Sequence, residues 1–266
     1  MDIDLGAYFK RIGYTGGREP SLAALSGILY AHMSHIPFEN LDVLLGRAVR
    51  LDAESLQKKL VSACRGGYCF EHSSLLAAVL ERLGFGVTRR AARVVLFSPR
   101  TEVSRSHMFM TVELPEGTFV VDPGFGGFGA SFPVPLESGG GNGGASHWMA
   151  RDGRYTILRL RRGNDVIDGW VTDLEEENHP IDFETGNHYT ATHPDSPFRK
   201  IVMMSIVTPA GRTSVMNRDV TFHRGGDATT EQIPDRAAFR RLLVERYGFD
   251  LPEFDTLRIP AIPEWN

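Results

Sequence analysis

The chain has 266 residues, of which 42% are hydrophobic and 23% charged, and its formal net charge at pH 7 is −4. These values are typical of a globular protein of two or three closely packed lobes, and they exclude a disordered chain. Because the sequence has no basic cluster to neutralise phosphates and no run of roughly 18 apolar residues to span a bilayer, neither nucleic acid nor a membrane is an expected partner.

The start of the chain is acidic and has no apolar core of signal-peptide length, so we expect a cytoplasmic protein. The first third of the chain has helical periodicity. Ser21 and Asp52 are suitable N-caps for two of the helices, whereas Pro37 and Gly84 end helices. The predicted helices are SLAALSGILYAHMSHI (21–36), AESLQKKLV (53–61) and HSSLLAAVLERLGF (72–85).

After Gly86 the apolar residues repeat every second position, as in β-strands. The predicted strands are VTRRAARVVLF (87–97), SHMFMTVEL (106–114), GTFVVD (117–122), WMARDGRYTILRL (148–160, with a turn at DG) and NDVIDGWVTDL (164–174). Short turns favour antiparallel pairing, so a compact β-lobe is expected. Within it, SGGGNGGAS (138–146) predicts a mobile surface loop without a catalytic role.

The last part of the chain mixes both periodicities. The predicted elements are the strands KIVMMSIVTP (200–209) and GRTSVMNRDVTFH (211–223) and the helix DRAAFRRLLVERYGF (235–249). A third, mixed lobe follows from this pattern.

The segment RGGYCFE (65–71) places Cys69 directly before a predicted helix. Unpaired N–H groups and the positive end of the helix dipole favour a thiolate there, and the preceding glycines allow close backbone approach. Two cysteines are too few for a disulfide scaffold, so Cys64 and Cys69 are expected to be free. A small buried structural cysteine is one alternative reading. A zinc site of Cys64, Cys69 and His72 is another, but it lacks a fourth ligand.

A cysteine nucleophile needs a base, and the base needs an orienting group. Among nine histidines, His107 opens a predicted strand, and the chain returns to Asp122 at the end of the next one, where rigid scaffolds often present reactive groups. A two-residue turn at Glu116 and Gly117 would place Asp122 opposite Thr111, about 13 Å from His107 at ~3.3 Å per residue. Direct contact would then need a bulge or a different loop.

RGGYCFE, His107 and VDPGFGG (121–127), together with IPFENLDVLLG (36–46), resemble the arylamine N-acetyltransferases almost from end to end. The similarity includes HYTATHPDSPF (188–198) and GRTSV (211–215), and the RGG-x-C-x-E and PFEN elements together are highly specific. The resemblance implies an α+β fold with a papain- or transglutaminase-like cysteine core. It consists of a helical lobe with the nucleophile (1–86), an antiparallel β-barrel lobe with the His and Asp (87–190) and an α/β lid (191–266).

The resemblance also implies a reaction. Cys69 would attack the thioester of acetyl-CoA, His107 would hold the thiolate as an ion pair, and Asp122 would orient the imidazole. The acetyl group would then move to the nitrogen of an arylamine, arylhydrazine or N-hydroxyarylamine in a ping-pong cycle, without a metal. A monomer or homodimer is expected.

An aryl acceptor needs an apolar slot beside the sulfur, for which Phe38, Phe125 and Phe70 are candidates, although Phe70 in the first helical turn fits a core role better. Gly124, Gly126 and Gly127 lie in a loop whose backbone N–H groups would suit the CoA pyrophosphate, or else form only a tight turn.

Arg65 and Glu39 stand in the two most specific motifs, and we expect them to pair and brace the turn before Cys69. The chain departs from the usual family pattern at one point: His72 and Ser73 replace a frequent Gln-Asn pair, which bears on the choice of acceptor.

Three other functions remain open from the residues. A related amide synthase would use a carrier-bound acyl donor, and a papain- or transglutaminase-like hydrolase would use water or a lysine amine as acceptor. A non-catalytic binding module would keep the fold, but the intact Cys69, His107 and Asp122 argue against it.

Overall fold

The computed structural model describes residues 3–137 and 145–265. Its helices are α1 (Leu5–Ile12), α2 (Leu22–His35), α3 (Leu41–Leu44), α4 (Ala53–Leu56), α5 (Cys69–Arg82), α6 (Pro180–Thr192) and α7 (Arg236–Leu242). The π-helical turns η1 (Gln57–Ser62) and η4 (Leu243–Tyr247) extend α4 and α7. Single 3₁₀ turns are η2 (Gly126–Phe128), η3 (Pro197–Arg199), η5 (Pro252–Thr256) and η6 (Pro263–Trp265). No helix in the described ranges is long and apolar enough to cross a membrane.

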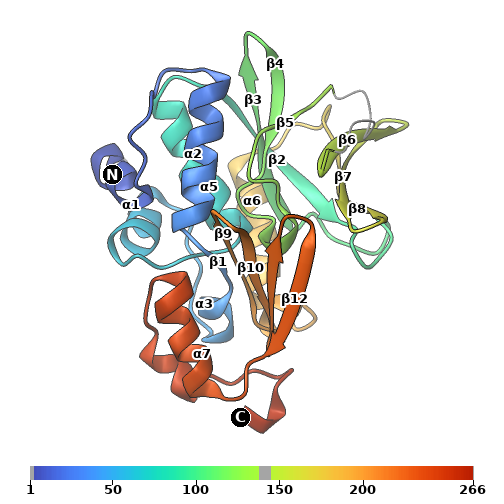
Figure 1. Cartoon of the computed structure of the whole chain (residues 1–266). Helices are drawn as coiled ribbons and strands as arrows, with labels where there is room; N and C mark the ends of the chain where they lie inside the picture. The colour runs from blue at the N-terminus through green and yellow to red at the C-terminus, as the bar shows by residue number, and fades with distance from the viewer. Residues whose placement is uncertain (1–2, 138–144, 266) are drawn as a thin grey trace.

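A seven-stranded antiparallel sheet lies in the upper right of Figure 1, and it curls into a nearly closed barrel. Its spatial order is β5-β4-β3-β2-β8-β7-β6. The strands are β2 (Gly86–Val94), β3 (His107–Leu114), β4 (Gly117–Val121), β5 (Val134–Pro135), β6 (His147–Asp152), β7 (Tyr155–Arg162) and β8 (Asp165–Asp173). The glycine-rich loop predicted between β5 and β6 lies outside the described residues, except for its last two positions.

A second antiparallel sheet, of order β1-β9-β10-β11-β12, packs with α7 in the lower part of Figure 1. Its strands are β1 (Phe38–Glu39), β9 (Met203–Thr208), β10 (Gly211–Met216), β11 (Asp219–Arg224) and β12 (Asp227–Gln232). Because β1 belongs to the N-terminal part of the chain, its pairing with β9 places Phe38 at the junction of the helices and the C-terminal sheet. The expected α+β fold is confirmed.

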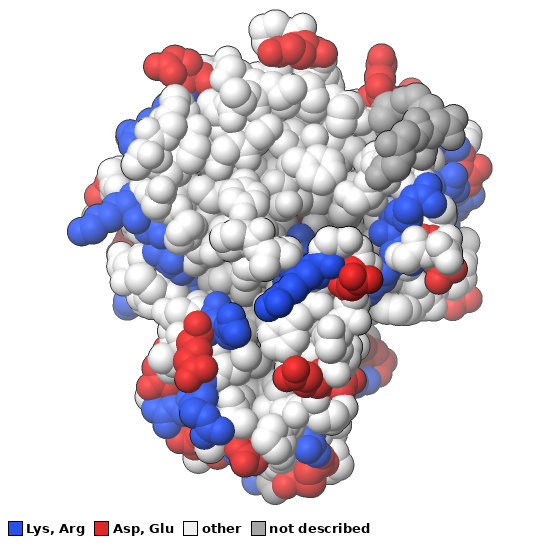
Figure 2. Space-filling model, in the orientation of Figure 1, with Lys and Arg blue, Asp and Glu red and all other residues white. Residues whose placement is uncertain are grey.

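The N-terminal helices and the barrel share one hydrophobic core. Leu25 and Ile28 of α2 and Leu76 of α5 belong to the same buried cluster as Met110 and Val112 of β3. Domain limits at residues 86 and 190 stay predictions, since this cluster spans the first of them. On the face shown in Figure 2, the surface over α2 and α5 carries few charged side chains, and most of the charges gather at the edges and over the lower part.

Local signals fix the ends of the helices that carry the site. Ser21 accepts a hydrogen bond from the N–H of Ala24 at the start of α2, and Asp52 accepts one from Ser55 at the start of α4, as predicted. Helix α5 begins at Cys69 itself, earlier than the periodic run of leucines indicates.

Of the two alternatives left open for the contact between His107 and Asp122, a bulge or a different loop, the structure has the different loop. The β3–β4 turn is formed by Pro115 and Glu116, because Leu114 pairs with Gly117 and Thr111 pairs with Val120. Continued by one position past the last pair, Met110 and Val121, this register places Asp122 opposite Phe109, two residues from His107 rather than four. Residues two apart on a strand face the same side of the sheet, so His107 and Asp122 are diagonal neighbours without a bulge.

Candidate active site

The turn before α5 presents Cys69 on a tightly packed backbone. A Cβ atom added to Gly66 would lie 2.0 Å from the carbonyl oxygen of Pro37, and one added to Gly124 would lie 2.4 Å from the Cα of Cys69. Only glycine fits at either position. Cys69 is 2% exposed and is the first residue of a 14-residue helix, where free N–H groups and the helix dipole favour negative charge on sulfur.

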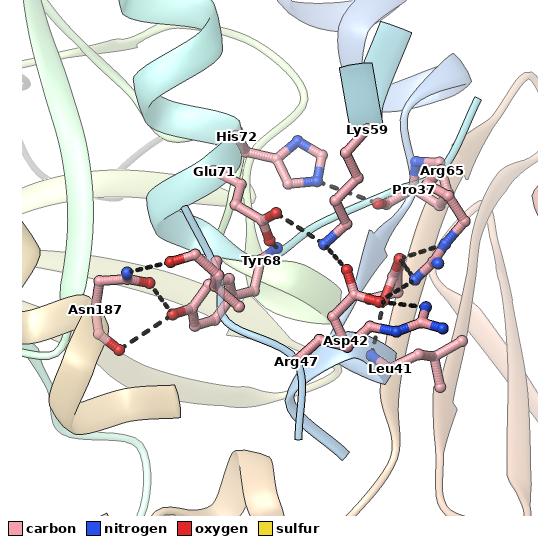
Figure 3. Close-up of polar contacts among 12 residues, drawn as sticks. Pro37, Leu41, Asp42, Arg47, Lys59, Arg65, Tyr68, Glu71, His72 and Asn187 are labelled. Carbon is pink, nitrogen blue, oxygen red and sulfur yellow. Dashed lines mark hydrogen bonds and ion pairs between the residues drawn. The ribbon is translucent and has the colours of Figure 1, made fainter. Parts of the chain in front are cut away.

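A buried network of charges holds this turn (Figure 3). Arg65 donates to Glu39 Oε1 through Nε at 3.1 Å and Nη2 at 2.6 Å, so the two side chains are paired as expected. Lys59 joins Glu71 Oε1 at 2.7 Å to Asp42 Oδ2 at 2.8 Å. The other Glu71 oxygen accepts the N–H of Tyr68, the residue before Cys69.

Opposite charges in this network shift the pKa values of Lys59 and Asp42. Burial alone would lower the pKa of Lys59, but Glu71, Glu39 and Asp42 raise it above its ordinary value. For Asp42, burial opposes ionisation, but Lys59 and Arg65 lower its pKa to about 2. Lys59 and Asp42 therefore stay ionised at neutral pH, whereas burial raises the pKa of Glu71.

His107 and Asp122 form a buried pair beside the sulfur. His107 Nε2 lies 2.8 Å from Asp122 Oδ2, and the two side chains are 3% and 2% exposed. Asp122 is held in turn by the indole N–H of Trp170, 2.9 Å from Oδ2, and by the N–H of Gly124, 3.3 Å from Oδ1. Trp170 was not predicted as a site residue, because a single tryptophan in a strand carries no signal of its partner.

The sulfur completes the arrangement. Cys69 Sγ lies 3.8 Å from the carbonyl oxygen of Ser106, and its hydrogen bond to His107 is one cause of the raised imidazole pKa. Burial opposes protonation of His107, but Asp122 and then Cys69 raise its pKa to about 10. Since Asp122 uses Nε2, the ring nitrogen left for the thiol is Nδ1. An imidazolium at neutral pH facing a thiol at a helix start is suited to hold a thiolate.

Two of the predicted aromatic residues, Phe38 and Phe125, lie beside Cys69 and His107. The Phe125 ring centroid lies 5.1 Å from that of His107, and Phe38 belongs to the buried cluster around Cys69. Phe70 also belongs to that cluster but is 1% exposed, in line with a core role.

The glycine loop contacts both the Phe38 ring and the C-terminal sheet. A Cβ added to Gly126 would lie 3.3 Å from the Phe38 ring, and one added to Gly127 would lie 3.2 Å from Ser214 Oγ. Arg212 of β10 donates to the carbonyls of Gly126 and, at 2.6 Å, Gly129. Arg212 was not predicted as a site residue either, because its partners are main-chain atoms.

Of two cavities in the described part of the chain, the smaller one lies at the predicted site residues. A cavity of about 270 Å³ beside β2 and β8 is lined by none of the predicted site residues, whereas a narrow one of about 10 Å³ is lined by Phe38, Gly126 and Arg212, among others. Within residues 3–137 and 145–265, no group of three or more His, Cys, Asp or Glu side chains is arranged to hold a metal ion. Cys64 is exposed and Cys69 buried, and both are free.

Comparisons with known proteins identify the family of this chain. Residues 21–256 match the N-acetyltransferase family model. The chain is 37% identical to arylamine N-acetyltransferase of Mycolicibacterium smegmatis, with 94% of each chain covered, and 33% identical to that of Escherichia coli, with 94% of this chain and 90% of the other covered. The solved structure of Mycobacterium marinum arylamine N-acetyltransferase in complex with CoA superimposes with a TM-score of 0.87 at 32% identity, covering 94% of each chain. With most of its length matched at these identities, the chain belongs to the arylamine N-acetyltransferase family of acyltransferases.

Proposed function

We propose that this protein transfers an acetyl group from acetyl-CoA to the nitrogen of an arylamine, arylhydrazine or N-hydroxyarylamine through an acetyl-Cys69 intermediate. The observation that carries the proposal is the placement of Cys69 at the start of α5 beside the buried His107–Asp122 pair. The relatives named above supply the acetyl group and the aryl acceptor as substrate classes.

In the first half-reaction, the Cys69 thiolate attacks the thioester carbonyl, and the S–C bond to CoA breaks. One thiolate replaces another, so the exchange is close to balanced, and the imidazolium of His107 protonates the departing CoA sulfur. Asp122 keeps the imidazole oriented because its Oδ2 is itself fixed by Trp170.

In the second half-reaction, the neutral amine attacks the acetyl carbonyl of acetyl-Cys69. Neutral His107 accepts the proton that the amine nitrogen loses, the C–S bond breaks, and the Cys69 thiolate forms again beside the imidazolium. Phe38 and Phe125 are the proposed walls for the aryl ring, since Phe38 lies in the buried cluster around Cys69 and the Phe125 ring packs against His107.

The loop that contains Gly124, Gly126 and Gly127 is the proposed contact for CoA. Two carbonyls of the loop point to Arg212, and in a trans peptide the following N–H points the opposite way. The N–H groups of residues 127 and 130 are thereby directed away from Arg212, and such N–H groups suit pyrophosphate oxygens. Arg65 and Glu39 act only as structural support for the nucleophile. A cytoplasmic monomer or homodimer stays our expectation.

The test is the intact mass of the purified protein after incubation with acetyl-CoA alone. We expect one acetyl adduct on the Cys69 peptide, absent in Cys69→Ala and discharged by an arylamine such as 4-anisidine. Cys64→Ser is the matched control, because Cys64 is the other free thiol and is exposed, and it should keep the adduct.

If the wild type shows no adduct and the thioester stays intact, acetyl transfer is wrong, and a carrier-bound acyl donor becomes the better hypothesis. If the thioester is consumed without an amine, the protein is a hydrolase. An adduct that survives in Cys69→Ala would assign the nucleophile to another residue.

A further inference from the structure

Tyr8, His32 and His72 form a buried hydrogen-bonded chain that ends at the Pro37 carbonyl. Tyr8 Oη lies 2.9 Å from His32 Nδ1, His32 Nε2 lies 2.8 Å from His72 Nδ1, and His72 Nε2 lies 3.2 Å from the oxygen of Pro37. The three side chains are at most 1% exposed. Figure 3 shows the last of these contacts, with His72 projecting from α5 toward Pro37.

The protons of this chain have one consistent arrangement. A carbonyl only accepts, so His72 Nε2 carries the proton and His72 Nδ1 is the acceptor for His32 Nε2–H. His32 Nδ1 then accepts the Tyr8 hydroxyl proton. Burial lowers the pKa of His72 to about 4 and that of His32 well below its ordinary value, so both rings are neutral at physiological pH. Each donor has an acceptor, and the tautomers are locked.

The hydrogen-bonded chain ends at Pro37, the residue before Phe38. The His72 and Phe38 rings are nearly parallel, with an interplanar angle of 17° and centroids 6.4 Å apart. The Pro37 carbonyl also accepts the N–H of Gly67 at 3.2 Å, so His72 contacts both the backbone before Phe38 and its ring. The Phe198 ring also contacts Phe38, but at an interplanar angle of 64°.

We propose that His72 is a positioning residue that sets acceptor specificity, because it holds the Phe38 ring as the flat wall of the aryl site beside Cys69. The proposal rests on the proposed function, since it assigns Phe38 to the acceptor. The ligand class is a planar aromatic amine, whose ring would pack on Phe38 beside Cys69.

Two substitutions separate the ring from its hydrogen bonds. In His72→Gln, the amide can still donate to the Pro37 carbonyl and accept from His32, but no ring remains to pack on Phe38. In His72→Phe, a ring remains, but His32 Nε2–H loses its acceptor in a buried site. His35→Gln is the control, because His35 lies on α2, the helix that carries His32, and its ring bonds to the Ala31 carbonyl rather than to His32 or His72.

The measurement is the single-turnover rate of each half-reaction: CoA release from acetyl-CoA, and discharge of acetyl-Cys69 by a narrow amine, 4-anisidine, and a wide one, 2-aminofluorene. For His72→Gln we expect an acetylation rate within about twofold of the wild type. The ratio of kcat/KM between the two amines should change about fivefold, which is the order of magnitude of one lost aromatic contact. For His72→Phe we expect that ratio to be kept and the thermal unfolding midpoint to fall.

Equal losses with both amines in His72→Gln, or acetylation that slows in parallel, would overturn the proposal and leave His72 a purely structural role. A change of the ratio in His72→Phe as large as in His72→Gln would also overturn it, because the ring would then not matter. A wild type that forms no acetyl-Cys69 would instead refute the proposed function, and this proposal with it.

Discussion

Hydrogen bonds to both oxygens of the Asp122 carboxylate fix the orientation of His107. Asp122 Oδ2 accepts hydrogen bonds from both His107 Nε2 and Trp170 Nε1, while Oδ1 accepts the N–H of Gly124. Three donors around one buried carboxylate leave it little freedom to rotate. The imidazole is thereby fixed in one orientation, which is the role that a nucleophile's base requires of its partner.

The raised pKa of His107 predicts a pH-dependent contribution to stability. Its pKa is about 10 in the folded protein and about 6.5 when unfolded. The contribution is therefore fully present below about pH 6.5 and is lost as pH rises through about 10, by up to about 1.4 kcal/mol per pH unit. Without the Asp122 charge, burial would lower the His107 pKa, so Asp122→Asn should remove this stabilisation.

The measurement is the free energy of unfolding by urea at pH 7, 8, 9 and 10, in a Cys69→Ala background so that no thiol at the site titrates. The difference between the parent and Asp122→Asn should shrink as pH rises. Asp168→Asn, which removes an exposed carboxylate paired with Arg159, is the control and should show no such trend. A difference that is constant from pH 7 to pH 10 would contradict the raised pKa of His107.

These residues also show how far sequence reasoning reaches. Cys69, His107 and Asp122 were predicted because a glycine-cysteine segment before a helix and two strand ends carry local signals. The geometry that joins His107 to Asp122 was not, because a one-residue difference in the β3–β4 turn moves Asp122 from four residues to two from His107. Trp170 and Arg212 act through distant partners, and no local pattern indicates such contacts.

At the scale of the element, the start of α5 depends on charges from three other segments. Arg65 lies in the turn, Glu39 in β1, Asp42 in α3 and Lys59 in η1, so the position of Cys69 is set by residues that are far apart in sequence. The Arg65 side chain is 10% exposed, and that of Glu39 is fully buried. Breaking one partner of such a buried pair leaves an uncompensated charge.

Arg65→Met should therefore lower the free energy of unfolding by about 3–5 kcal/mol and slow acetylation of Cys69. Arg47→Met is the matched control: Arg47 also reaches Asp42, at 3.4 Å, but its side chain is 43% exposed. Surface pairs of this kind contribute less than about 1 kcal/mol. Urea unfolding and the mass-based acetylation rate check both variants, and equal effects of the two would mean that the buried pair does not brace the turn.

Helix α6 (Pro180–Thr192) and strand β12 (Asp227–Gln232) were missed for a physical reason. The buried residues of α6 are Phe183, Gly186, Asn187 and Thr190, so its inner face has little apolar periodicity. Every residue of β12 is exposed, so an edge strand leaves no alternating pattern. By contrast α2, with a serine cap and seven buried residues, was predicted within one residue at each end.

At the scale of the whole molecule, one cation joins the barrel to the C-terminal sheet. Arg212 of β10 donates to the carbonyls of Gly126 and Gly129 and to Ser205 Oγ, and no carboxylate contacts it in the part of the chain that the structure describes. Burial lowers its pKa to about 10, so it remains charged at neutral pH. A buried charge without a counter-ion is unfavourable unless its hydrogen bonds are made, and here three oxygen atoms accept them.

If these contacts hold the glycine loop in the shape that receives CoA, Arg212→Met should raise the KM for acetyl-CoA about tenfold while leaving discharge of acetyl-Cys69 by 4-anisidine nearly unchanged, because the acceptor walls Phe38 and Phe125 remain. Arg212→Lys keeps the charge but presents only one nitrogen, so its KM for acetyl-CoA should lie between those of the wild type and Arg212→Met.

Arg218→Met is the control, since Arg218 bonds to Ile233, Pro234 and Glu264 within the C-terminal part alone. Steady-state kinetics with both substrates varied give the two KM values. A lower thermal midpoint with an unchanged KM for acetyl-CoA would mean that Arg212 only holds the two sheets together and does not shape the loop for the acyl donor.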